Sequence, residues 1–72
     1  MKETYIHGHK VYYEDNAAGG ADYLLHHLDD AEAKVFFDQA HYKGRIKLED
    51  AQNRHYILSH NSDGTYGLEH KF

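Results

Sequence analysis

The chain has 72 residues, enough for one small domain with a modest core, because a chain of this length buries only about 60% of the surface that its unfolded form exposes. Hydrophobic residues make up 40% of it and include seven Tyr and three Phe, which excludes a disordered chain. It has no Cys and no apolar stretch long enough to span a membrane. We therefore expect a soluble cytoplasmic protein without disulfides, thiolate metal sites or a membrane partner.

The net charge depends strongly on the histidines. Lys and Arg number 8 against 12 Asp and Glu, which gives −4 when all eight histidines are neutral, and unperturbed imidazole titrates close to neutral pH. Acidic residues gather in residues 14–38, where Lys34 is the one Lys or Arg. Because such a region repels phosphates, we do not expect direct binding to nucleic acid.

Residues 4–13 predict a β-hairpin, since β-forming residues lie on both sides of the segment that begins at His7. The register that keeps apolar residues together places Ile6 opposite Val11, and one long strand is the alternative. Residues 16–20 read Asn-Ala-Ala-Gly-Gly, which predicts a flexible loop.

Residues 21–43 have helical periodicity, and a signal for the start of a helix lies in the middle of this segment. Asp29 precedes Glu32 by three positions, which is the spacing of a capping box, and Gly44 suits the position just past a helix end. The cap favours a break between a short helix over residues 21–28 and a main helix over 30–43, while one long helix is the alternative. On the main helix, we expect Val35, Phe36 and Ala40 to cover the sheet.

The C-terminal part predicts a three-stranded antiparallel meander. Two turns of the same kind, at 50–54 and 61–65, use Asn53 and Gly64 as left-handed residues. Pairing Asp50 with Arg54, and Asn61 with Thr65, fixes the register of all three strands. One face then holds the apolar side chains of Ile46, Leu48, Tyr56, Leu58, Tyr66 and Leu68. The other face holds Arg45, Lys47, Glu49, His55, Ile57, Ser59, Thr65, Glu69 and Lys71.

These elements predict a single α+β domain over residues 1–72, in the order ββ-α-βββ. The N-terminal hairpin and the C-terminal meander form an antiparallel sheet, and one main helix packs on one of its faces.

Histidines provide the candidate metal ligands. His7 and His9 would point to the same side of a strand, and His26 and His27 lie three or four positions before Asp30 on a continuous helix. We favour ordinary turn and helix-end histidines at these positions, because metal sites need three or four convergent ligands. His60 and His70 face Tyr66 and Tyr56 in the meander register, as rim residues or as acid-sensitive packing partners.

Catalytic motifs are missing from the sequence. Ser59 and Ser62 do not lie in a nucleophile elbow, and the Gly19-Gly20 pair lacks the Lys and hydroxyl of a phosphate-binding loop. We therefore expect no enzyme and no cofactor.

The abundance of tyrosine indicates an interaction surface. One small core cannot bury seven Tyr, and Tyr is favoured where proteins meet, although β-propensity alone is an equal explanation. Tyr5 and Tyr12 on one side of the hairpin, and Tyr13 on the other, form the predicted contact surface. The leading hypothesis is a small interaction or regulatory domain that binds a protein partner or itself as a homo-oligomer. The alternatives are a histidine-based transition-metal protein and an acidic mimic of nucleic acid built on residues 14–38.

Overall fold

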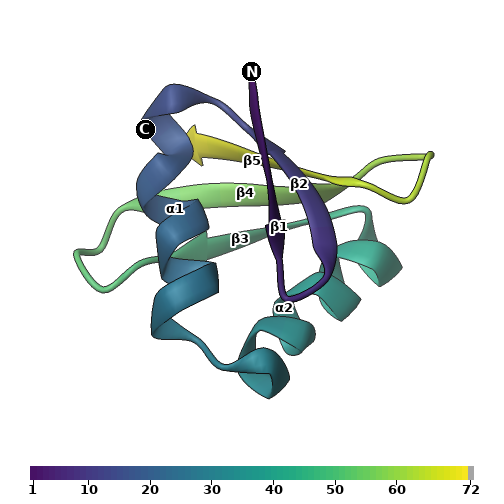
Figure 1. The fold of residues 1–72 in the computed structure, drawn as a ribbon, viewed down its shortest axis with the longest axis horizontal. Coiled ribbons are helices and arrows are strands. Elements are labelled where there is room, and N and C mark those ends of the chain that lie inside the picture. Colours follow the sequence, from purple (N-terminus) through teal and green to yellow (C-terminus); the bar gives the residue numbers. More distant parts are fainter. Residues whose placement is uncertain (72) are drawn as a thin grey trace.

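The structure, a computed structural model, describes residues 1–71 and consists of one five-stranded sheet with helices on one face (Figure 1). The strands are β1 (Lys2–Ile6), β2 (His9–Tyr13), β3 (Arg45–Glu49), β4 (His55–His60) and β5 (Tyr66–Lys71). The helical segments are η1 (Asp15–Ala17), α1 (Ala18–Asp22), η2 (Tyr23–His27) and α2 (Asp30–Lys43). The strand order is β1-β2-β5-β4-β3, which confirms the predicted α+β architecture.

The sheet is mostly antiparallel, but β2 and β5 run parallel in its centre. Their register pairs Val11 with Tyr66 and Tyr13 with Leu68. This pairing places the hairpin's buried residues, Ile6 and Val11, in the same core as the meander. No described helix is long and apolar enough to cross a membrane.

The hairpin forms, but its predicted register is wrong. Ile6 pairs with His9 and Thr4 pairs with Val11, across a two-residue turn. His7 and Gly8 both adopt positive φ angles, 50° and 86°, as a tight turn that matches strand twist requires. Ile6 and Val11 are still buried on the same face, because they lie diagonally rather than opposite each other.

Residues 16–20 are helical, so the predicted flexible loop is wrong. They lie in η1 and α1, and Ala17 and Gly20 are buried. A Cβ atom on Gly20 would lie 2.8 Å from Cδ1 of Tyr56, and one on Gly19 would lie 2.9 Å from the Tyr56 hydroxyl oxygen. The two glycines therefore let α1 approach the sheet closely, a packing role that composition alone does not reveal.

The predicted break before Asp29 is confirmed. Leu28 is extended, with φ −108° and ψ 143°, and α2 begins behind it. Asp29 accepts a hydrogen bond from the backbone N–H of Glu32 at 2.8 Å, and the Glu32 carboxylate accepts one from the backbone N–H of Asp29 at 3.1 Å. Both halves of the capping box are present, and the helix ends at Gly44 with φ 90°.

The face of α2 that meets the sheet differs from the prediction. Ala33, Phe37 and Ala40 are buried, whereas Val35 is 53% exposed and Phe36 packs only at the edge of the core. The two alanines let the helix backbone lie close to the sheet, and the Phe37 ring stacks on His9, with ring centroids 4.2 Å apart. The run of three apolar residues at 35–37 left the helix face ambiguous in the sequence.

The meander has the predicted register throughout. Leu48 pairs with Tyr56, Leu58 pairs with both Ile46 and Leu68, and the Asp50 and Asn61 N–H groups close the two turns. The predicted left-handed residues, Asn53 and Gly64, have φ angles of 62° and 90°. The predicted apolar face is the core face: all of its members are buried except the half-buried Ile46 on the edge strand.

Candidate interaction surface

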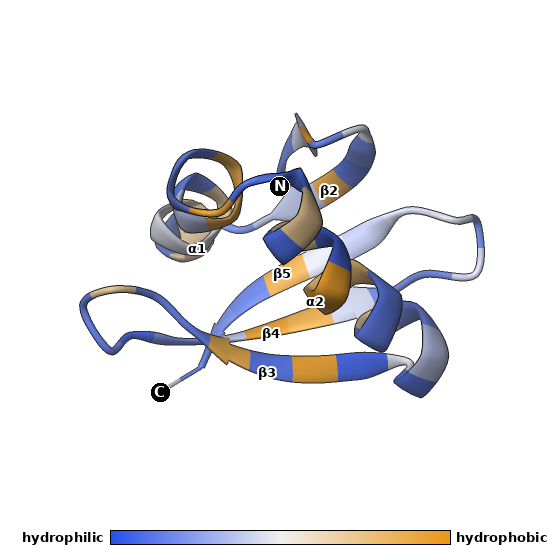
Figure 2. Cartoon of the chain, turned by 90° about the horizontal axis from the view of Figure 1, so that it is seen from below, coloured by the Kyte–Doolittle hydropathy of each residue, from blue (hydrophilic) through white to orange (hydrophobic). Residues whose placement is uncertain are grey.

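The side of the sheet opposite the helices is bare, and we call it the open face. In Figure 2, α1 lies above β5, α2 passes in front of β5 and β4, and no helix lies below β3. By strand alternation and register, the open face consists of Glu3, Tyr5, Lys10, Tyr12, Arg45, Lys47, Glu49, His55, Ile57, Ser59, Gly67, Glu69 and Lys71.

Two of the three predicted contact tyrosines lie on this face. Tyr5 is 63% exposed, and Tyr12 is half-buried one strand away, diagonal to it. Tyr13 points to the other side and packs against the core, so it does not belong to the same surface. Lys10 lies between the two tyrosines, with its ammonium 5.4 Å from the centre of the Tyr12 ring. The Tyr12 hydroxyl and the Glu3 carboxylate raise the pKa of Lys10, so this position stays cationic.

A hollow of about 360 Å³ lies beside Tyr12, over Gly67 in the central strand β5. A Cβ atom on Gly67 would meet nothing within 4 Å, and this glycine does not have a positive φ angle. Neither packing nor backbone conformation therefore requires glycine there. Glycine inside a strand often marks a place where another backbone or a ligand comes close.

The opposite end of the open face is basic. Arg45, Lys47 and Lys71 surround Ile57 in a second hollow of about 310 Å³. Contact with Lys47, together with the charges of Lys47 and Arg45, lowers the pKa of Lys71. The predicted meander register already assigned these three cations to one face, so their proximity could be predicted from the sequence.

The four candidate metal-ligating histidines have separate environments. His7 Nε2 lies 3.1 Å from the Leu24 carbonyl oxygen and 3.2 Å from that of Leu28, and its Nδ1 contacts the Asp30 carboxylate. His9 stacks on Phe37. His7 thus fastens the hairpin tip to the junction between η2 and α2.

His26 and His27 lie at the end of η2, each with Nε2 3.7 Å from an oxygen of Asp22. The break at Leu28 separates them from Asp30, so the ligand spacing that a continuous helix would give is not formed. Within residues 1–71, the side chains of His, Asp and Glu do not form a group of three or more suited to a metal ion.

His60 and His70, on the core side of the sheet, pack on aromatic rings, as the predicted register indicates. His60 lies 5.2 Å from Tyr66 and His70 lies 5.5 Å from Tyr56, measured between ring centroids. His60 also stacks on His41 from the end of α2, at 4.3 Å.

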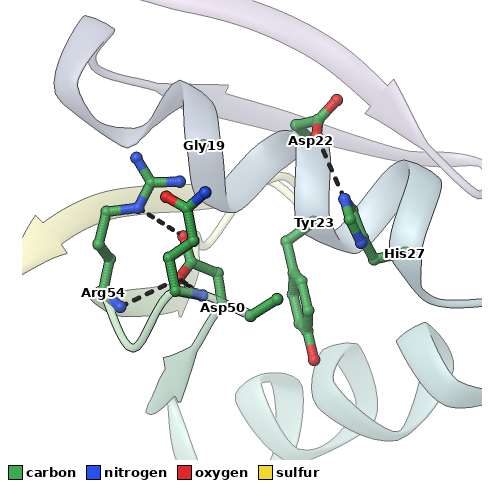
Figure 3. Close-up of a pocket in the computed structure, with 8 residues that line it drawn as sticks. Gly19, Asp22, Tyr23, His27, Asp50 and Arg54 are labelled. Carbon is green, nitrogen blue, oxygen red and sulfur yellow. Dashed lines mark hydrogen bonds and ion pairs between the residues drawn. The ribbon is translucent and has the colours of Figure 1, made fainter.

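A smaller, polar hollow of about 120 Å³ lies between α1, η2 and the β3–β4 turn (Figure 3). Its most unusual lining group is Asp50, a buried carboxylate. One oxygen accepts hydrogen bonds from the backbone N–H groups of Gln52 and Arg54, and the other accepts from Arg54 Nε at 2.8 Å and from the Tyr56 hydroxyl at 2.9 Å. Burial by itself would raise the pKa of Asp50, but these hydrogen bonds lower it to about 2.

The hydrogen bonds to Asp50 therefore build the turn and fix the side chains of Arg54 and Tyr56, which lie against Gly19 of α1, and they occupy both carboxylate oxygens. The sequence assigned Asp50 only to the opening of a turn. The sequence signal for these contacts was the spacing of Asp50 from Arg54 and Tyr56, because the turn brings their side chains to the same side as Asp50.

Comparison with protein-family models, curated proteins and solved structures yields no match, so function has to be inferred from this chain's own residues.

Proposed function

We propose that the protein is a small non-enzymatic interaction domain that binds a protein partner through the open face of its sheet, with Tyr5 and Tyr12 as the principal contacts. The observation that carries this proposal is the position of Tyr5, a large ring 63% exposed on a bare sheet, beside Tyr12 and the hollow over Gly67. Tyrosines supply broad contact area with a polar tip, and exposed aromatic side chains in a cluster are typical of binding surfaces.

The chemistry of the surface also favours a protein over a small molecule. Its hollows are partly open to solvent, whereas small-molecule sites are concave and enclose most of the ligand. Gly67 lets a partner's backbone come close to β5, and Lys10 adds a cation between the two rings.

The test compares three immobilised proteins: the wild type, the double variant Tyr5→Ser/Tyr12→Ser, and the control Tyr42→Ser. Tyr42 is 88% exposed on α2, away from the open face, so its loss removes an even more accessible ring elsewhere. We expect a protein from the source cells to bind the wild type and the control but not the double variant, with thermal unfolding unchanged by more than about 0.5 kcal/mol. Equal capture by all three proteins would contradict the proposal.

A further inference from the structure

The outer edge of β3 has free backbone groups at alternate positions. β3 is the last strand of the sheet, and Figure 2 shows it as the lower border. At its two ends, the Asp50 N–H donates to the Arg54 carbonyl at 3.0 Å and the His60 N–H donates to the Gly44 carbonyl at 2.8 Å. Because backbone groups alternate in an antiparallel pair, the even-numbered residues bond to β4, and Arg45, Lys47 and Glu49 point their N–H and C=O groups outward.

The sequence of this strand is complementary to itself when it is reversed. Antiparallel pairing of Arg45-Ile46-Lys47-Leu48-Glu49 about Lys47 places Arg45 opposite Glu49 and Ile46 opposite Leu48. In this register the odd-numbered residues, Arg45, Lys47 and Glu49, lie opposite one another, and these are the residues with free backbone groups. A single alignment therefore satisfies both the backbone hydrogen bonds and the side-chain pairs. Opposite charges on one face and apolar side chains on the other both stabilise such a pair.

We propose that β3 pairs with β3 of a second copy of this chain, about a two-fold axis at Lys47. Each protomer contributes the same surface, which is the requirement for a closed symmetric dimer. The two sheets then join edge to edge, with the helices of both copies on one side and both open faces on the other. The dimer leaves Tyr5 and Tyr12 free, so this inference does not depend on the proposed function.

The opposite edge of the sheet does not have this property. Pairing β1 with itself about Thr4 would place Lys2 opposite Ile6 and Glu3 opposite Tyr5, which matches neither charge nor apolar surface. Of the two edges, β3 is therefore the one suited to a second copy.

One feature of the β3 pair opposes association. Lys47 faces Lys47 of the partner at the axis, and like charges directly opposite are destabilising. The strand is also only five residues long, so the interface is smaller than that of a permanent dimer. The structure thus indicates a weak dimer in rapid exchange, which the concentration of the protein would control.

A charge exchange tests the register directly. Arg45→Glu leaves two carboxylates facing each other in both cross-strand pairs, and Glu49→Arg leaves two cations, so each variant should associate on the order of tenfold more weakly. The double variant Arg45→Glu/Glu49→Arg restores both pairs and should associate like the wild type. An equimolar mixture of the two single variants should form a heterodimer, since each supplies the charge that the other lacks.

Sedimentation velocity from about 10 µM to about 1 mM measures these species. His55→Ala is the control, because it removes the 3.5 Å ion pair between His55 and Glu49 within one chain without touching the edge. It should associate like the wild type, while Lys47→Thr, which removes the repulsive pair, should associate several-fold more tightly. A wild type that stays monomeric to about 1 mM, or a double variant as weak as the single ones, would overturn the proposal.

Discussion

Replacing Asp50 by Asn should destabilise the domain by about 2 kcal/mol, and the loss should depend on pH. The carboxylate is buried, and its folded-state pKa of about 2 lies below the ordinary 3.8 because four hydrogen bonds favour its charged form. A depression of nearly two pKa units corresponds to about 2 kcal/mol of stability. A domain of this size is stable by only about 4–10 kcal/mol, so the melting temperature should fall by about 10 °C or more.

The sign of the pH dependence follows from the direction of the pKa shift. A carboxyl group whose pKa is lowered on folding stabilises the protein above its unfolded pKa, and this contribution is lost as the pH falls through the folded value. For Asp50 the window runs from about pH 5 down to about pH 2. The wild type should therefore lose about 2 kcal/mol more than Asp50→Asn across this window, and the two stabilities should converge near pH 2.

The assay is urea unfolding at a series of pH values, followed by circular dichroism, with Asp38→Asn as the control. Asp38 is an exposed carboxylate on α2 whose partner is Lys34 at 3.5 Å, and pairs of this kind contribute little. Equal stabilities of the wild type and Asp50→Asn at pH 7, or parallel curves from pH 5 to pH 2, would refute the view that the Asp50 carboxylate stabilises the turn through its hydrogen bonds.

Three further predictions concern packing and are measured by thermal or denaturant unfolding. Phe37→Ala should cost about 3–5 kcal/mol and Val35→Ala less than about 0.5 kcal/mol, because Phe37 is buried and Val35 is 53% exposed; the reverse order would mean that α2 packs on the face the sequence predicted. Gly20→Ala should cost about 1–3 kcal/mol, since its Cβ would lie 2.8 Å from the Tyr56 ring. Gly67→Ala should be neutral or stabilising by up to about 1 kcal/mol, since open space lies above it, and a large loss would show that the hollow is not open.

Local sequence signals were sufficient to predict those features that the residues of a single turn, helix end or strand determine. Asn53 and Gly64 fixed two turns, and these turns fixed the register of β3, β4 and β5 together with their buried face. Asp29 and Glu32 fixed the start of α2. Alternation along β2 was also enough to place Tyr12 and Tyr13 on opposite faces. Tyr5 shares the face of Tyr12 as predicted, because the predicted hairpin register was wrong by two residues, which leaves the faces unchanged.

Tertiary packing decided the features that involve residues far apart in the chain. The composition of Gly19 and Gly20 predicts a loop, but the segment is helical. In the structure, α1 comes so close to the Tyr56 side chain that only glycine fits at these positions. Three consecutive apolar residues made the buried face of α2 ambiguous until contact with the sheet selected Phe37. The parallel pairing of β2 with β5 likewise had no local signal, because it joins strands more than fifty residues apart in order to bring the hairpin into the common core. The sequence by itself thus determined turns, caps and strand faces, since neighbouring residues set these, and the tertiary structure alone decided which surfaces met.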